Sequence, residues 1–229
     1  MKYLILGDGK LATEIHKQTD WDYISMDKDQ IKFEHPGSYF DYLKSYDTII
    51  NCIGYTNTTD NTKSEHWKIN YVGVIDLVYI CNQLKKKLVH ISSDYIYDHS
   101  NTNATEEDVP VHSKTWYAYT KLLSDGHVQA VSKDYLLIRT SFKLRPYPWK
   151  VAWVDCKTNV DYIDTITELI VKLIKLNASG VYNVGTEAKT FYDLAKQTVP
   201  DCKPVEDNYE FERPHDVTMN LNKLNTLIK

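Results

Sequence analysis

The chain opens on Lys2-Tyr3-Leu4-Ile5-Leu6-Gly7-Asp8-Gly9-Lys10-Leu11-Ala12, an apolar run that ends in a glycine turn. The run is typical of a buried strand, and residues 10–19 have the period of a helix. A strand, a G-x-G-x-x-A turn and a helix in this order bring bare backbone close to a pyrophosphate. We therefore expect Gly7, Gly9, Lys10 and Leu11 to bind a dinucleotide, and a plain glycine turn is the alternative.

Strand and helix patterns alternate along most of the chain, which favours an α/β fold of the Rossmann type with a doubly wound parallel sheet. We expect strands at 2–6, 22–26, 47–53, 88–92, 134–140 and 180–184, and helices at 10–19, 37–46, 62–84, 114–132 and 162–176. Residues 1–142, completed by 160–185, should form an NAD(P)-binding Rossmann domain. Residues 143–159 and 186–229 should form a small C-terminal substrate cap.

Composition excludes several classes of protein. The net charge of −4 over 229 residues gives no basic surplus for nucleic acid. There is no apolar stretch of membrane-spanning length and no signal-peptide pattern, so we expect no membrane partner and a cytoplasmic protein. The four cysteines and eight histidines do not fall at metal-ligand spacing, so no metal site is expected.

Two short stretches carry groups suited to proton transfer, Ser92-Ser93-Asp94-Tyr95-Ile96-Tyr97 and Tyr117-Ala118-Tyr119-Thr120-Lys121. A phenol and an ammonium four residues apart share one face of a helix. At ~5 Å and an effective dielectric of ~20, Coulomb's law gives ~3 kcal/mol, or about two pKa units. This spacing predicts a Tyr117 whose pKa is lowered toward neutrality, where a general acid works best.

The Tyr-x-x-x-Lys spacing by itself proves little, because 18 tyrosines among so many lysines produce roughly two such pairs by chance. The second pair is Tyr192 and Lys196, which has no serine-rich strand end upstream. We interpret it as an ordinary helix face. Tyr117 and Lys121 differ because they follow a buried strand that ends in two serines.

Other candidate ligands lie where strands of the predicted sheet end. Asp27 follows Gly7 by 20 residues, where an acid binds the adenosine ribose and favours NAD. Lys28 beside it could meet a 2′-phosphate, so NADP stays open. We also expect cofactor contacts from four residues at the ends of later strands, which are Ile53, Gly54, Tyr55 and Thr140. Ser92 could contact the cofactor or point into the sheet.

Residues 98–113 are polar and irregular, which predicts a surface loop beside the site. The loop could cover a substrate or could be a connection without a role. Asn70 could be an exposed polar residue or part of a buried polar network. Arg213 could bind a diphosphate through its planar donor fork or form a surface ion pair.

These residues resemble the extended short-chain dehydrogenase/reductase superfamily, and most of all its dTDP-4-dehydrorhamnose reductase branch. The resemblance spans nearly the whole chain and rests on the glycine turn, 47–56, 89–97, 117–121, 138–141 and 213–217. It implies that Ser93, Tyr117 and Lys121 are a catalytic triad. It also implies NAD(H) or NADP(H) as cofactor, and reduction of a 4-keto group on a nucleotide-linked deoxysugar in deoxysugar biosynthesis.

The resemblance leaves other activities open. Asp94-Tyr95 stands where sugar-nucleotide dehydratases have an Asp-Glu pair, which disfavours dehydration. An NAD-dependent epimerase would use the same triad, and some proteins similar to this branch are cofactor-binding regulatory subunits. Asp94, Tyr95 and Arg213 are the expected substrate contacts, with Ser93. The helices at 62–84 and 114–132 could pair in a homodimer or pack on the sheet.

Overall fold

A six-stranded parallel sheet forms the centre of the molecule. The computed structural model describes residues 1–26, 28, 29, 31–58, 62–108, 110, 115–206 and 214–229. The strands lie in the order β10-β5-β4-β3-β1-β2, and each neighbouring pair is parallel. Their bounds are β1 (Tyr3–Leu6), β2 (Asp22–Ile24), β3 (Thr48–Asn51), β4 (Lys87–Ile91), β5 (Tyr135–Thr140) and β10 (Gly180–Val184).

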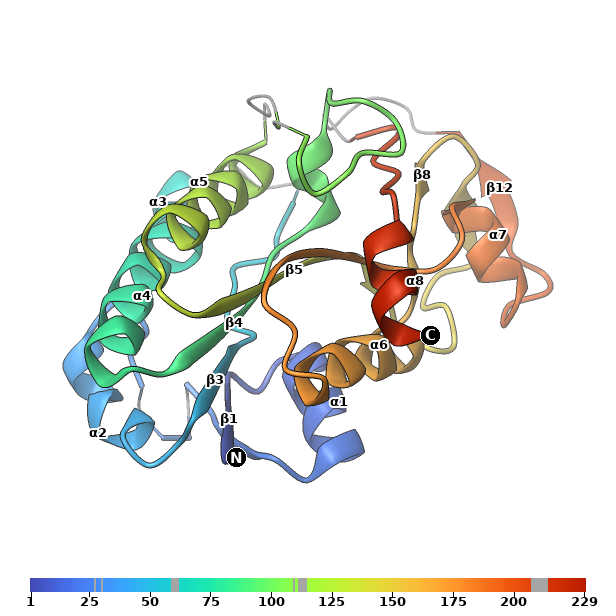
Figure 1. Ribbon diagram of the computed structural model, residues 1–229. Helices are drawn as coiled ribbons and strands as arrows, with labels where there is room; N and C mark the ends of the chain where they lie inside the picture. Colours follow the sequence, from blue (N-terminus) through green and yellow to red (C-terminus); the bar gives the residue numbers. More distant parts are fainter. Residues whose placement is uncertain (27, 30, 59–61, 109, 111–114, 207–213) are drawn as a thin grey trace.

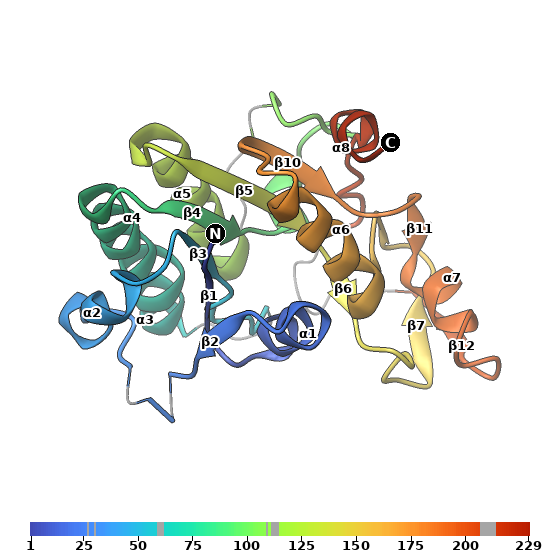
Figure 2. The ribbon, with the colours of Figure 1, turned by 60° about the horizontal axis from the view of Figure 1, so that its bottom comes forward.

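Helices cover both faces of this sheet, so the predicted doubly wound Rossmann-type fold is confirmed (Figures 1 and 2). Helices α1 (Lys10–Thr19) and α6 (Ile163–Lys175) cover one face, where Ile5, Val89 and Ile138 lie in the same apolar cluster. The other face is covered by α3 (Lys63–Glu65), the π-helical segment η2 (His66–Val72), α4 (Gly73–Leu84) and α5 (Trp116–Val131). In the described part of the chain, no helix has the length and apolarity needed to cross a membrane.

The order of the strands reverses at β1, because β2 and β3 lie on its two sides. In open α/β sheets, ligands bind beyond the carboxyl ends of the strands at such a point. The glycine turn and the ends of β3, β4 and β5 therefore share the edge of the sheet where a ligand is expected.

Two predicted helices differ from the observed elements. The region 37–46 contains only the 3₁₀ turn η1 (Pro36–Ser38) and a single turn α2 (Phe40–Leu43), since Tyr39 between them has φ −133° and ψ −2°. The predicted helix 62–84 is present but divided into α3, η2 and α4. The ring of Phe33 packs so closely on Gly73 that a Cβ there would lie 2.3 Å from it.

A smaller unit lies at one end of the sheet. Its strands pair two by two and share a separate apolar cluster that includes Tyr147, Tyr162, Phe191 and Leu194. Its elements are β6 (Phe142–Lys143), β7 (Val151–Trp153), β8 (Lys157–Thr158), β9 (Asp161–Tyr162), β11 (Lys189–Thr190), α7 (Phe191–Lys196) and β12 (Lys203–Val205).

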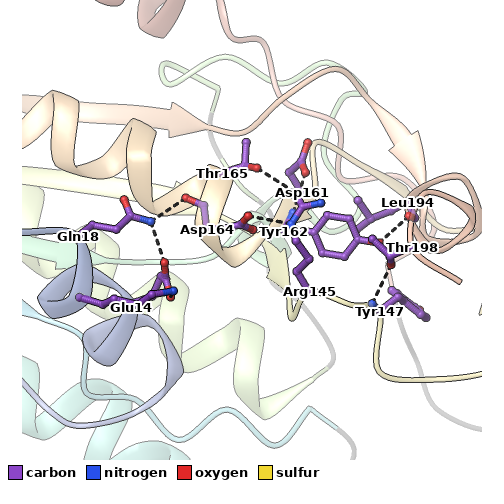
Figure 3. Close-up of polar contacts among 11 residues, drawn as sticks. Glu14, Gln18, Arg145, Tyr147, Asp161, Tyr162, Asp164, Thr165, Leu194 and Thr198 are labelled. Atoms are coloured by element: carbon purple, nitrogen blue, oxygen red, sulfur yellow. Dashed lines mark hydrogen bonds and ion pairs between the residues drawn. The ribbon is translucent and has the colours of Figure 1, made fainter.

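Polar contacts fasten this unit to the helices of the sheet (Figure 3). The Arg145 guanidinium donates to Asp164 at the start of α6 at 2.8 Å and lies over the ring of Tyr162. The Tyr162 hydroxyl in turn donates to the carbonyl of Leu194 at 2.9 Å. Helix α1 joins the same set, because Gln18 donates to the Asp164 carbonyl at 3.1 Å.

The C-terminal segment contacts both the sheet and the smaller unit. Helix α8 (Asn222–Ile228) packs against β10, and Leu224 belongs to the main apolar cluster. The preceding residues bind the loop after η3 (Asp94–Tyr97), where the Ala104 N–H donates to the Thr218 carbonyl at 2.9 Å. Helix α8 thus lies on the sheet, whereas residues 215–217 before it pair with Lys157 in β8 of the smaller unit. The described part of the 98–113 loop is held by its hydrogen bonds to this segment.

Candidate functional site

The glycine turn has the backbone that a dinucleotide site needs. Gly7 has φ +106°, which favours glycine, and its N–H donates to the Ile24 carbonyl at 2.9 Å. A Cβ on Gly9 would meet nothing within 4 Å, so the approach to the N-terminus of α1 is open. Lys10 is exposed, whereas the Leu11 side chain is buried in the core. Only the backbone of Leu11 can therefore take the role expected of that residue.

The end of β3 is held by a buried amide. The Tyr55 N–H donates to Asn70 Oδ1 at 2.8 Å, and Asn70 Nδ2 donates to the Tyr55 carbonyl at 2.9 Å. Asn70 is 1% exposed and lies in η2, so it belongs to a buried network. Ile53 is buried beneath this turn. A Cβ on Gly54 would lie 4.0 Å from Lys121 Nζ, which brings the turn next to the candidate catalytic lysine.

Two buried hydroxyls lie at the ends of neighbouring strands, Ser92 after β4 and Thr140 at the end of β5. Neither hydroxyl has a hydrogen-bond partner among the described residues. Buried polar atoms in native proteins are nearly always satisfied, so an unpaired one calls for an explanation such as a water, an ion or a ligand. Together with the open glycine turn, they fit a bound dinucleotide.

Ser93 and Tyr117 are in contact, and Lys121 reaches the end of the same strand. Ser93 caps η3 by accepting from the Tyr95 N–H at 3.2 Å, and its hydroxyl hydrogen-bonds Tyr117. Helix α5 begins after Thr115, whose side chain accepts from the Ala118 N–H, and this start presents Tyr117 in its first turn. Lys121 Nζ donates to the Ile91 carbonyl at 2.7 Å, so the ammonium lies at the end of β4.

The prediction that Lys121 lowers the pKa of Tyr117 is wrong. Burial raises the pKa of Tyr117 to about 12; the hydrogen bond with Ser93 opposes that rise, and the nearby Asp94 charge adds to it. Burial also lowers the pKa of Lys121 to about 8, although Asp125 and Cys52 act in the opposite direction. Neither side chain contributes to the pKa shift of the other, so burial decides both.

Asp94 is a buried carboxyl directly beside this group. Burial raises its pKa to about 6, against hydrogen bonds from Thr158 and Ser93 and the charge of Lys143. The Thr158 hydroxyl donates to it at 2.5 Å and comes from β8 of the smaller unit. Thr158 and Lys143 were not predicted as site residues, because only the fold brings them to the end of β4.

Tyr95 contacts the triad through its ring, whose centroid is 5.7 Å from that of Tyr117 in an edge-to-face pair. Lys28 is exposed at the end of β2. Asp27 and Arg213 lie outside the described residues.

Comparison with known proteins identifies the family. Residues 1–147 match the family model described as RmlD substrate binding domain. The chain belongs to the RmlD substrate-binding domain family.

Sequence relatives of this RmlD-family chain include sugar-nucleotide enzymes. It is 27% identical over 176 residues to the spore coat polysaccharide biosynthesis protein SpsK of Bacillus subtilis, with 73% of the chain and 58% of SpsK covered. It is 26% identical over 171 residues to dTDP-4-keto-6-deoxy-D-glucose reductase of Streptomyces niveus, with 66% and 59% covered. The RmlD-family chain thus spans less than two thirds of the length of these curated relatives.

Solved structures share the fold over nearly the whole chain. The dTDP-4-dehydrorhamnose reductase from Bacillus anthracis, in complex with NADP, superposes with a TM-score of 0.83 at 21% identity and covers 99% of this chain and 93% of its own. The Clostridium acetobutylicum dTDP-4-dehydrorhamnose reductase gives a TM-score of 0.84, also at 21% identity, with coverages of 99% and 92%.

This RmlD-family chain has a buried ion pair next to Lys121 on helix α5. Sequence reasoning did not predict it. Arg139 Nε and Nη2 donate to the two oxygens of Asp125 at 3.0 and 2.9 Å, one turn of α5 beyond Lys121. Arg139 also donates to the Tyr97 hydroxyl at 2.5 Å, and Tyr97 donates to Asn183 in β10 at 2.8 Å. The only signal in the sequence is an arginine within an otherwise apolar strand.

Proposed function

We propose that the protein reduces a 4-keto group on a nucleotide-linked deoxysugar, with NADH or NADPH as the reductant. The observation that carries this proposal is the convergence of Ser93, Tyr117 and Lys121 beside the glycine turn and the unpaired strand-end hydroxyls. The membership of the RmlD substrate-binding domain family and the names of its relatives favour the same reaction.

Each member of the triad has a separate task in this proposal. The bound nicotinamide supplies the hydride. Ser93 would turn its single proton from Asp94 Oδ1 to the substrate carbonyl, and Tyr117 supplies the proton that the new alkoxide needs. Because the pKa of Tyr117 is about 12, its phenol is protonated at neutral pH, as a proton donor must be. Lys121 donates one proton to the Ile91 carbonyl, which leaves two donors that would bind the nicotinamide ribose.

We assign substrate binding to the expected cap of residues 143–159 and 186–229, together with Asp94, Tyr95 and Arg213. The hydrogen bond from Thr158 to Asp94 supports this assignment, because it joins the unit to the turn that carries Ser93. A sugar bound above Tyr117 would therefore contact both parts of the molecule.

Oxidation of NADH and NADPH with 4-keto-6-deoxy sugars carried on dTDP, UDP or GDP tests this function. We expect one equivalent of cofactor to be oxidised for each sugar reduced, with one preferred carrier. Conversion of the sugar with tightly held, recycled NAD would instead identify an epimerase. Cofactor binding without turnover of any of these sugars would favour a regulatory subunit.

Two finer proposals concern the surroundings of the enzyme. We place the reaction in the cytoplasm, in keeping with the four free thiols. Helices α4 and α5 pack on the sheet, and α4 keeps Tyr79 63% exposed, so a homodimer would use that outer face. Sedimentation of the purified protein as a monomer would exclude the dimer.

A further inference from the structure

Asp8 lies between the two glycines of the turn, yet its side chain reaches the end of β2. Its Oδ2 accepts a hydrogen bond from the Ser25 hydroxyl at 2.5 Å. Ser25 is fully buried and follows β2 directly, whereas Asp8 is exposed. A buried hydroxyl thus holds an accessible carboxylate at the point where the turn and the second strand meet.

The orientation of that hydroxyl is fixed from both sides. The Lys28 N–H donates to Ser25 Oγ at 3.2 Å, so the hydroxyl accepts there and has its single proton to give to Asp8. The Ser25 N–H donates to Asp29 Oδ2 at 2.8 Å, which brings a second carboxylate to the same strand end. Lys28 contacts Ser25 only through its backbone N–H, and the Lys28 side chain is exposed.

In this fold the adenosine ribose of a dinucleotide lies at the carboxyl end of the second strand. An acid there binds the 2′-hydroxyl of NAD, while the 2′-phosphate of NADP needs a cation. We propose that Asp8, aimed by Ser25, makes this chain select NADH over NADPH. The carboxylate accepts from the 2′-hydroxyl and repels a phosphate dianion in the same place. Lys10 is exposed two residues after Asp8, and Lys28 is exposed three residues after Ser25, so the proposal requires that Asp8 outweigh these two cations.

The inference rests on the dinucleotide site of the proposed function, so its test uses cofactor binding alone, without any sugar. NADH and NADPH are titrated separately into the purified protein, and the dissociation constants are measured from the fluorescence of the bound dihydronicotinamide. We expect NADH to bind at least ~10-fold more tightly, which corresponds to about 1.4 kcal/mol.

Asp8→Asn keeps an acceptor for Ser25 and removes only the charge. We expect it to reduce the NADH preference about tenfold, mainly through tighter NADPH binding. Asp20→Asn is the matched control, because it removes the same charge at the other end of α1, about 15 Å away. Asn tolerates the left-handed conformation observed there (φ 57°), and this variant should keep the wild-type ratio.

Three results would overturn the proposal. The first is that the wild type binds NADPH as tightly as NADH or more tightly. The second is that Asp8→Asn leaves the ratio of the NADH and NADPH dissociation constants unchanged. The third is that Asp8→Asn weakens the binding of both cofactors equally, which would show that Asp8 has a structural role only. Selective NADH binding without sugar reduction would refute the proposed reaction and leave the role of Asp8 standing.

Discussion

The two Tyr-x-x-x-Lys pairs have the same spacing and very different surroundings. Lys121 is 5% exposed and donates to the Ile91 carbonyl at the end of a central strand, and its partner Tyr117 hydrogen-bonds Ser93. Lys196 is exposed and donates to the carbonyl of Pro200 at the end of α7, a helix of six residues. The spacing places two groups on one helix face, but only burial at the edge of the sheet can give them a role in proton transfer.

The largest effect should come from the ion pair that supports the first of these helices. Arg139→Gln leaves the buried Asp125 carboxylate without its bidentate partner, which should lower the free energy of unfolding by ~3–5 kcal/mol. Arg145→Gln breaks the ion pair with Asp164. The Arg145 and Asp164 side chains are 44% and 39% exposed, so this change should lower the free energy of unfolding by under ~1 kcal/mol. Urea unfolding measures the change in the free energy of unfolding for both variants. Equal losses would show that burial does not make the Arg139 pair more important for stability than the Arg145 pair.

The pH dependence of stability should distinguish the two lysines. The pKa of Lys121 is lowered to about 8 in the folded state, so between pH 8 and ~10.4 the unfolded chain binds more protons. The contribution of Lys121 to the free energy of unfolding should therefore rise across this window, by up to ~3 kcal/mol. The buried Cys52 and Cys81 thiols, whose pKa is raised to about 12, act in the opposite direction above pH ~9, so the measured quantity is the free energy of unfolding of the wild type minus that of the variant. This difference should increase with pH for Lys121→Met and stay constant for Lys196→Met. A constant difference for Lys121→Met would contradict the lowered pKa of Lys121.

Catalysis should separate the two tyrosines. Tyr117→Phe removes the proposed proton donor and should lower kcat by at least ~10²-fold, with cofactor binding little changed. Tyr192→Phe makes the same chemical change on α7 and should leave kcat within about twofold. Steady-state rates with the preferred sugar nucleotide measure both. Full turnover by Tyr117→Phe would eliminate the mechanism.

The smallest effects should come from two glycines in the helices around Tyr117. Gly73→Ala would place a Cβ 2.3 Å from the fully buried ring of Phe33, which should destabilise the protein by ~1–3 kcal/mol. Gly126→Ala in α5 meets nothing within 4 Å and should stabilise it by ~0.5–1 kcal/mol. Thermal unfolding measures both changes. A stabilised Gly73→Ala variant would show that the packing of the start of α4 on Phe33 is loose.

The sequence predicted the sheet and the helix that carries Tyr117 because both depend on local periodicity. It did not predict the π-helical segment, which places Asn70 against Tyr55, or the approach of Thr158 to Asp94, 64 positions away. The predicted direction of the Tyr117 pKa shift was wrong for a related reason. Spacing along a helix sets the distance between two charges, whereas desolvation depends on everything else that the fold packs around them.

The hydrogen bonds between the 98–108 loop and the C-terminal segment have a consequence for the kinetics of folding. The Asn103 N–H donates to the Thr218 hydroxyl at 2.8 Å across 115 positions of sequence, and such distant contacts form slowly. The same loop accepts from Arg139 through the carbonyl of Glu106. We therefore expect a refolding chain to regain its helical circular dichroism before it regains activity, with the interval set by the arrival of the C-terminal segment.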